Sequence, residues 1–406
     1  MLASVGQKVG TRAKIETYTE VVLKKGGEKK HRPDGLIVVR TGGRTWSALV
    51  EAKVGNSDLT PEQVESYLEL ARLNGIDALI TLSNQFTSLP THHPIALSSA
   101  SRKKAEAYHW SWKYVVTQAS LLISNEQVSD ADQRIILNEM NRFLTHPSAG
   151  VKSFDQMPAA WSELVARVQA GGKISASASE TKEVIGAWHQ ELRDLSLILS
   201  RQLSIDVDTY ISRAHASDPA ARLKASIGDF AANESLDASL IVPDAAAPID
   251  ICCDLKKRTI SVAMRLKAPA DRKSTKARVS WIVRQLGKAD AANLHLRLHW
   301  PGRSAHTQYP LGVLRDENTV VGADRVGLVP HSFEIILVRD IGGRFGQRKN
   351  FISELESAVP QFYEQVGQHV RGWVAPAPRI KEAAPSTIED IEDLAESIAE
   401  HRDALG

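Results

Sequence analysis

Two carboxylates and a lysine near the start of the chain have the types and spacing of a metal-dependent hydrolytic site. Asp34 follows Pro33 at the start of one expected strand, and Glu51 and Lys53 lie in the next, with sixteen residues between Asp34 and Glu51. Residues two apart on a strand point to the same face, and a hairpin can bring Asp34 onto the face of Glu51 and Lys53. Two carboxylates, with the carbonyl of Ala52, suit Mg²⁺, which keeps several waters and completes its shell with substrate phosphate. An ammonium beside the metal can orient or deprotonate the attacking water, so these residues indicate phosphodiester hydrolysis.

Two further polar residues are expected on the helix that follows. Gln63 and Tyr67 are four apart and therefore share one helix face, from which both can donate to phosphate oxygens or orient Lys53. The whole arrangement resembles the PD-(D/E)XK nuclease superfamily, and Gln63 and Tyr67 resemble the Q-x-x-x-Y element of its RecB-like exonuclease branch. The resemblance covers about residues 15–85 and implies a restriction-endonuclease-like fold. It also implies metal binding by Asp34 and Glu51, a catalytic role for Lys53 and a supporting role for Gln63 and Tyr67, with Mg²⁺ as cofactor (Mn²⁺ as a substitute) and DNA as substrate.

One element of the family pattern is missing. Members of the superfamily usually carry a helix before the first strand, often with an acidic residue that faces the metals. Here about ten residues precede that strand and none is acidic, while Glu16 and Glu20 lie in the strand itself. The sequence therefore leaves open whether one or two metals bind. The simpler alternative is that Asp34 and Glu51 form ordinary ion pairs with Lys53, but an unpaired carboxylate in an otherwise apolar strand would be costly.

The elements expected around these residues form an α/β core with a mixed sheet. Strands are expected at residues 15–25, 36–39 and 46–54, with a hairpin turn at 41–44. Thr60 can cap a helix that has Pro61 at its first position and ends near residues 74–75. Residues 78–82 are continuously apolar, as expected of a strand buried on both faces. From residue 105 to about 167 the pattern is helical, which completes a first domain at residues 1–168.

The rest of the chain is expected to form a linker, a second α/β domain and an acidic tail. Residues 169–204 hold a Gly- and Ser-rich linker at 171–179 and a connecting helix at 180–202. Residues 205–375 form the second domain, with strands at 239–242, 249–254, 259–266, 294–300 and 333–338 and helices at 275–286 and 347–371. The tail, residues 376–406, has eight acidic residues and one basic residue between Glu382 and Asp403. It is a candidate for a protein partner or for contacts in a homo-oligomer.

The distribution of positive charge indicates two surfaces for nucleic acid. The formal net charge is only +2, but thirteen Lys and Arg residues and two acids lie between Lys256 and Arg303. Positive side chains can bind the phosphate backbone, and two clusters are the candidates. One cluster flanks Asp34, with a solvated hairpin loop as the alternative. The other begins an expected helix, with an idle basic surface or a face for a protein partner as the alternatives. The residues are Lys29, Lys30, Arg32, Lys273, Lys276 and Arg278.

Composition excludes several other classes of protein. A length of 406 residues indicates two or three domains, and no run of apolar residues is long enough to span a membrane. The two cysteines, Cys252 and Cys253, are adjacent and match neither a disulfide framework nor a zinc-ligand pattern. With no secretory signal recognisable at the start, a cytoplasmic protein is expected.

These observations favour a divalent-metal-dependent DNA nuclease with a role in phage defence, restriction or DNA repair, a setting suggested by architecture alone. A second hypothesis is a nuclease fold retained as a non-catalytic module that binds DNA or protein. A third is a nuclease that acts on RNA, because the metal site does not read the sugar.

Overall fold

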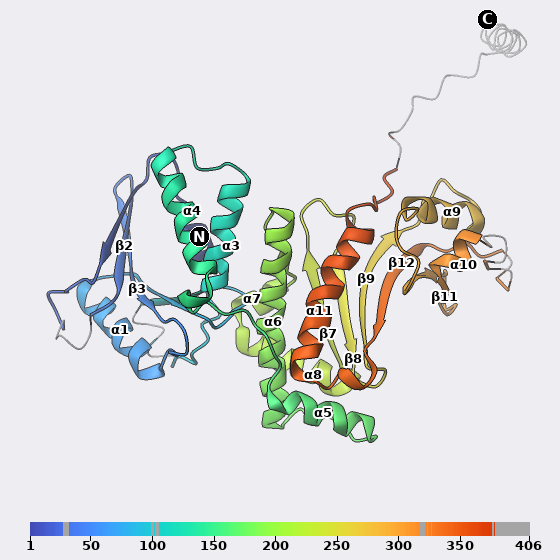
Figure 1. The fold of residues 1–406 in the computed structure, drawn as a ribbon, viewed down its shortest axis with the longest axis horizontal. Helices are drawn as coiled ribbons and strands as arrows, with labels where there is room; N and C mark the ends of the chain where they lie inside the picture. Colours follow the sequence, from blue (N-terminus) through green and yellow to red (C-terminus); the bar gives the residue numbers. More distant parts are fainter. Residues whose placement is uncertain are drawn as a thin grey trace, which may run out of the picture. The chain divides into compact units, whose positions relative to one another are not determined.

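The computed structural model describes residues 1–26, 32–98, 101, 105–316, 321–322, 324–325, 327–375 and 377. One compact unit spans Met1–Gly372 and contains two β-sheets with their helices (Figure 1). Trp373–Gly406 form a second unit, and nearly all of the expected acidic tail, residues 376–406, lies outside the described residues. In the described part of the chain, every helix is too short or too polar to cross a membrane.

The first sheet is mixed and has five strands in the order β1-β2-β3-β4-β5. The pairs β1–β2 and β2–β3 are antiparallel, whereas β3–β4 and β4–β5 are parallel. Gly42 and Gly43 form the two-residue turn between β2 and β3, and Gly42 takes a positive φ of 59° that a side chain would disfavour. The strands are β1 Lys14–Thr19, β2 Gly35–Thr41, β3 Arg44–Ala52, β4 Ala78–Ser83 and β5 Glu106–Ser111. The expected α/β organisation with a mixed sheet is confirmed.

The first strand is shorter than residues 15–25. β1 ends at Thr19 because its partner β2 begins opposite, at Gly35. The next residue, Glu20, has a φ of 50°, which turns the chain out of the extended conformation.

The helix α1 (Pro61–Asn74) begins and ends where the sequence indicates. The Thr60 hydroxyl accepts a hydrogen bond from the amide of Gln63 at 3.2 Å, and Gly75 closes the helix with a φ of 66°. Its buried face, centred on Leu68, belongs to the same hydrophobic cluster as Leu49 of β3. α1 therefore covers the sheet face to which Leu49 points.

The expectation of helices throughout residues 105–167 is wrong at its start. Residues 106–111 form β5, a strand parallel to β4, in which Tyr108 and Trp110 are buried. Aromatic side chains fit a pleated surface, and burial on both faces removes the alternation that would have identified a strand. The helices that follow are α3 (Trp112–Ser124) and α4 (Ala131–Thr145). Val115 of α3 clusters with Ile80 of β4, so α3 covers the face opposite α1.

The second sheet is antiparallel throughout and has seven strands in the order β11-β10-β12-β9-β8-β7-β6. All five strands expected in this region are present. The two short strands β6 and β11 were not expected. The strands are β6 Asp208–Thr209, β7 Ser235–Ile241, β8 Ile249–Asp254, β9 Thr259–Lys267, β10 Leu294–His299, β11 Thr307–Pro310 and β12 Ser332–Asp340.

Most helices in the second half pack with this sheet in one large core (Figure 1). α5 shares it: Trp161 is fully buried, lies 4.5 Å from Phe351 between ring centroids and donates to the carbonyl of Phe345. The hydrophobic contacts of α5 are thus with the core of the second sheet. The sequence had predicted this segment as part of a first domain at residues 1–168. The helices are α5 Ala159–Gln169, α6 Ser179–Leu203, α7 Arg213–Ser217, α8 Pro219–Asn233, α9 Thr275–Gln285, α10 Leu311–Asp316 and α11 Arg348–Phe362.

Shorter helical turns complete the chain. α11 is followed by a π-helical turn at Tyr363–Gly367, so the helix expected at residues 347–371 ends before residue 371. Short 3₁₀ turns lie at Leu2–Val5, Pro147–Ala149 and Gly342–Arg344.

Candidate functional site

Asp34 lies where β2 begins, next to the end of β3. Its Oδ2 accepts a hydrogen bond from the amide of Ala52 at 2.8 Å, and its carbonyl accepts one from the amide of Glu20. The side chain is exposed, and among the described residues nothing donates to its Oδ1. One carboxylate oxygen therefore fixes the position of Asp34, while the other stays open to a ligand.

Glu51 faces the helix α1. Alternation along β3 puts Glu51 on the same side as Leu49, which packs against α1. The side chain of Glu51 is 4 % exposed, and its Oε1 accepts from Lys53 Nζ and from Gln63 Nε2, both at 2.7 Å. The structure thus brings Glu51, Lys53 and Gln63 into one hydrogen-bonded group, built from a strand end and the first turn of a helix.

Tyr67 completes this group one helical turn after Gln63. Its hydroxyl donates to the carbonyl of Arg32 at 3.3 Å. Burial, together with the negative charge of Glu51, raises the pKa of Tyr67 to about 12. The phenol therefore remains a hydrogen-bond donor at neutral pH.

The electrostatics of the site leave its negative charge incompletely balanced. Burial raises the pKa of Glu51 above its ordinary range, and the nearby carboxylate of Asp34 raises it further. The hydrogen bond and the positive charge of Lys53 act in the opposite direction but do not cancel the rise. A cation held between the two carboxylates would remove this penalty.

The residues present fit a hard divalent cation that keeps much of its water. Carboxylate oxygens are the preferred ligands of Mg²⁺, and Asp34 and Glu51 supply them from adjacent strands. Within the described ranges, no group of three or more His, Cys, Asp or Glu side chains could enclose a metal. Glu16 pairs with Lys14 and Arg40. Glu20 pairs with Arg32 at 2.8 Å, so each of the two acidic residues of the first expected strand has a basic partner.

Trp112 is a site residue that the sequence did not indicate. Its indole Nε1 donates to the carbonyl of Lys53 at 2.7 Å, which fixes the backbone just after β3. The sequence placed Trp110 and Trp112 in one helix. The structure instead separates them at the junction of β5 and α3, so only knowledge of β5 would have identified this contact.

Of the three residues expected to bind nucleic acid beside Asp34, the structure describes only Arg32. Lys29 and Lys30 lie outside the described residues. Arg32 is exposed and forms an ion pair with Glu20 at 2.8 Å, and its Nε donates to the carbonyl of Glu20. Arg32 is therefore close to Asp34 in sequence but already has a partner.

The second basic cluster lies at the start of α9. Lys273 and Lys276 are exposed. Arg278 is partly buried and donates to the carbonyls of Arg272, at 2.7 Å, and Pro330, at 2.8 Å. Arg278 therefore holds two loops together. The two exposed lysines remain to meet a phosphate backbone, although Lys273 Nζ also donates to the carbonyl of Ala270 at 3.5 Å.

Comparison with known proteins adds no relative: no protein-family model, no curated protein and no solved structure matches this chain.

Proposed function

We propose that this chain is a divalent-metal-dependent DNA nuclease whose restriction-endonuclease-like core is the first sheet with α1. The observation that carries the proposal is the group formed by Glu51, Lys53 and Gln63, with a lysine and an amide both 2.7 Å from one buried carboxylate oxygen. An ordinary surface ion pair would need neither this burial nor the second donor.

Each residue of the group has a role in this proposal. Asp34 and Glu51 would hold Mg²⁺, or Mn²⁺ in its place, and the bound ion would lower the pKa of a water and stabilise charge on the phosphate. Lys53 is 24 % exposed at its side chain, so its ammonium can reach a phosphate oxygen or the attacking water as well as Glu51. Gln63 keeps Glu51 in place, and Tyr67 supplies a neutral donor.

A non-catalytic module is the second candidate, and one observation favours it. Within the described residues, the two carboxylates have no third acidic or histidine neighbour that could share a metal. A nuclease fold that has lost part of its metal site could still bind DNA through the exposed Lys273 and Lys276.

A substrate panel separates these functions. Purified protein is incubated with linear duplex DNA, circular duplex DNA, single-stranded DNA and RNA, each with Mg²⁺, Mn²⁺ or EDTA. The proposal predicts cleavage of DNA with either metal and none with EDTA. Binding without cleavage under all conditions would favour the non-catalytic module, and cleavage of RNA alone would make the chain a ribonuclease. Phage defence, restriction and repair all fit a DNA nuclease, and cutting of ends, nicks or intact circles would separate exonuclease from endonuclease action.

A further inference from the structure

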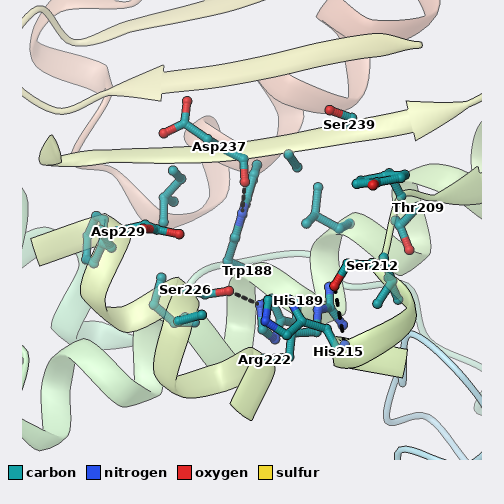
Figure 2. A pocket seen from close by; sticks show the side chains of 18 of the residues that line it. Trp188, His189, Thr209, Ser212, His215, Arg222, Ser226, Asp229, Asp237 and Ser239 are labelled. Atoms are coloured by element: carbon teal, nitrogen blue, oxygen red, sulfur yellow. Dashed lines mark hydrogen bonds between the residues drawn. The ribbon is translucent and has the colours of Figure 1, made fainter. Parts of the chain in front are cut away.

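A pocket of about 300 Å³ lies apart from the carboxylate site, among α6, α7, α8 and the first strands of the second sheet (Figure 2). Its volume is at the lower end of the range for small-molecule sites, roughly 300–1,000 Å³. Trp188, Phe230 and Leu236 form part of the apolar wall of the pocket. Its polar lining has an unusual composition: one buried arginine, two histidines and several hydroxyl groups.

Arg222 of α8 is the charged group of this pocket. Its side chain is only 9 % exposed, and its Nη1 donates to Ser88 Oγ. Among the described residues, no carboxylate lies within ion-pair distance of Arg222. Burial lowers the pKa of Arg222 to about 10, so the guanidinium stays charged at neutral pH. A buried charge without a counter-ion is costly, and Ser88 takes only one of the five N–H donors of a guanidinium.

The histidines around Arg222 add donors and no negative charge. His189 Nε2 lies 3.1 Å from Ser226 Oγ. Burial lowers the pKa of His189 to about 3, and Arg222, His92 and His215 lower it further. His92 is outside the pocket lining, and its Nε2 lies 3.0 Å from the carbonyl of Ala216.

The acidic residues of the pocket do not neutralise Arg222. Asp229 and Asp237 are exposed, and Figure 2 shows both away from the arginine. Asp237 accepts instead from Ser235 Oγ at 2.5 Å. Around Arg222 the pocket therefore presents a positive charge together with N–H and O–H donors.

We propose that this pocket binds a phosphate group, either free or carried by a small molecule, with Arg222 as its charged anchor. Arg222, His189 and the hydroxyls of Ser212 and Ser226 offer more donors than a carboxylate can accept, whereas the oxygens of a phosphate can use them. The proposal is independent of the nuclease activity, since none of these residues belongs to the Asp34–Glu51 site.

The test measures binding of inorganic phosphate by calorimetry at constant ionic strength, with acetate and glycerol 3-phosphate as the other probes. Wild type should bind phosphate saturably, and Arg222→Met should bind it at least tenfold more weakly. Arg213→Met is the matched control because Arg213 is exposed on the neighbouring helix and outside the pocket lining. Tighter binding of glycerol 3-phosphate than of phosphate would identify a carried group, and the reverse order a free anion.

Thermal unfolding gives a second measurement, which separates phosphate binding from any change in the stability of Arg222→Met. Without phosphate, Arg222→Met should be at least as stable as wild type, because an uncompensated buried charge has been removed. Phosphate should then raise the melting temperature of wild type and of Arg213→Met more than that of Arg222→Met, a difference that cancels the general stabilising effect of the salt. No saturable binding to wild type, acetate binding as tight as phosphate, or equal responses of all three proteins would overturn the assignment.

Discussion

A buried group of ionisable residues on α3, α6 and α11 makes the stability of the fold depend on pH. Glu191 and Asp194 of α6 are fully buried, and neither carboxylate oxygen of Glu191 has a hydrogen-bond partner among the described residues. Asp194 Oδ2 accepts from the amide of Phe154 at 2.7 Å. Burial raises the pKa of Glu191 well above its usual range, and that of Asp194 as well. Both carboxylates therefore resist ionisation in the folded protein.

Glu356 of α11 is the member whose titration falls in an accessible range. Burial, followed by the carboxylate of Asp194, raises the pKa of Glu356 from 4.5 to about 7, with Asp155 adding to the rise. The positive charges of Lys113 and Arg201 act in the opposite direction. Between the unfolded-state pKa of 4.5 and the folded-state pKa of about 7, the folded protein holds a proton that the unfolded chain has released. The free energy of unfolding therefore falls as the pH rises through this range.

The size of the effect follows from the same numbers. At about 1.4 kcal/mol per pH unit, the rise corresponds to roughly 3 kcal/mol, which solvent screening of the partly exposed side chain reduces to roughly 2 kcal/mol. Glu356→Gln cannot ionise. Relative to wild type, its free energy of unfolding should therefore be about 2 kcal/mol higher at pH 8 than at pH 5.

Urea unfolding at the two pH values measures this difference. Glu364→Gln is the control, because Glu364 is exposed in the π-helical turn directly after α11. Its effect should be the same at both pH values. If Glu356→Gln also changed stability equally at pH 5 and pH 8, the assignment of a buried, raised carboxyl to Glu356 would be refuted.

Three further substitutions test other contacts. Trp161→Ala removes a fully buried ring packed against Phe351 and should cost about 3–5 kcal/mol in urea unfolding, whereas a loss below about 1 kcal/mol would contradict the placement of α5 in the second core. Thr60→Ala removes the cap of α1 and should cost about 1 kcal/mol, while Thr60→Ser should keep most of the stability. Trp112→Phe removes the hydrogen bond to the carbonyl of Lys53 and should lower the cleavage rate with DNA binding unchanged, so an unaltered rate would deny Trp112 a positioning role.

The sequence was sufficient where local signals are strong. Thr60 and Pro61 marked the start of α1, Gly42 and Gly43 marked the hairpin turn, and the continuous apolar run marked β4. The strand pair and the helix start also explain how Glu51 and Gln63 could be expected on facing elements before their contact was known.

Longer-range features could not be predicted in this way. β5 has no alternating pattern because both of its faces are buried, so its aromatic residues resembled a helix face. α8 was not expected, although Leu223, Ile227 and Phe230 recur at helical spacing and pack in the second core. The pocket is lined by residues as distant in sequence as Ile185 and Ser239, and Arg222 bonds as far back as Ser88, so its assembly depends on the tertiary fold.

The cleavage rate of Lys53→Ala tests the central proposal most directly. Wild type, Lys53→Ala and Lys182→Ala are compared on the same DNA with Mg²⁺, with DNA binding and urea unfolding measured in parallel; Lys182 is exposed on α6 and serves as the matched lysine control. Loss of a group that moves or orients a proton typically costs a factor of about 10²–10⁴. We therefore expect Lys53→Ala to cut at least about 100-fold more slowly while it still folds and binds DNA, and Lys182→Ala to match wild type. Metal-dependent cleavage by Lys53→Ala at the wild-type rate would contradict the proposed site.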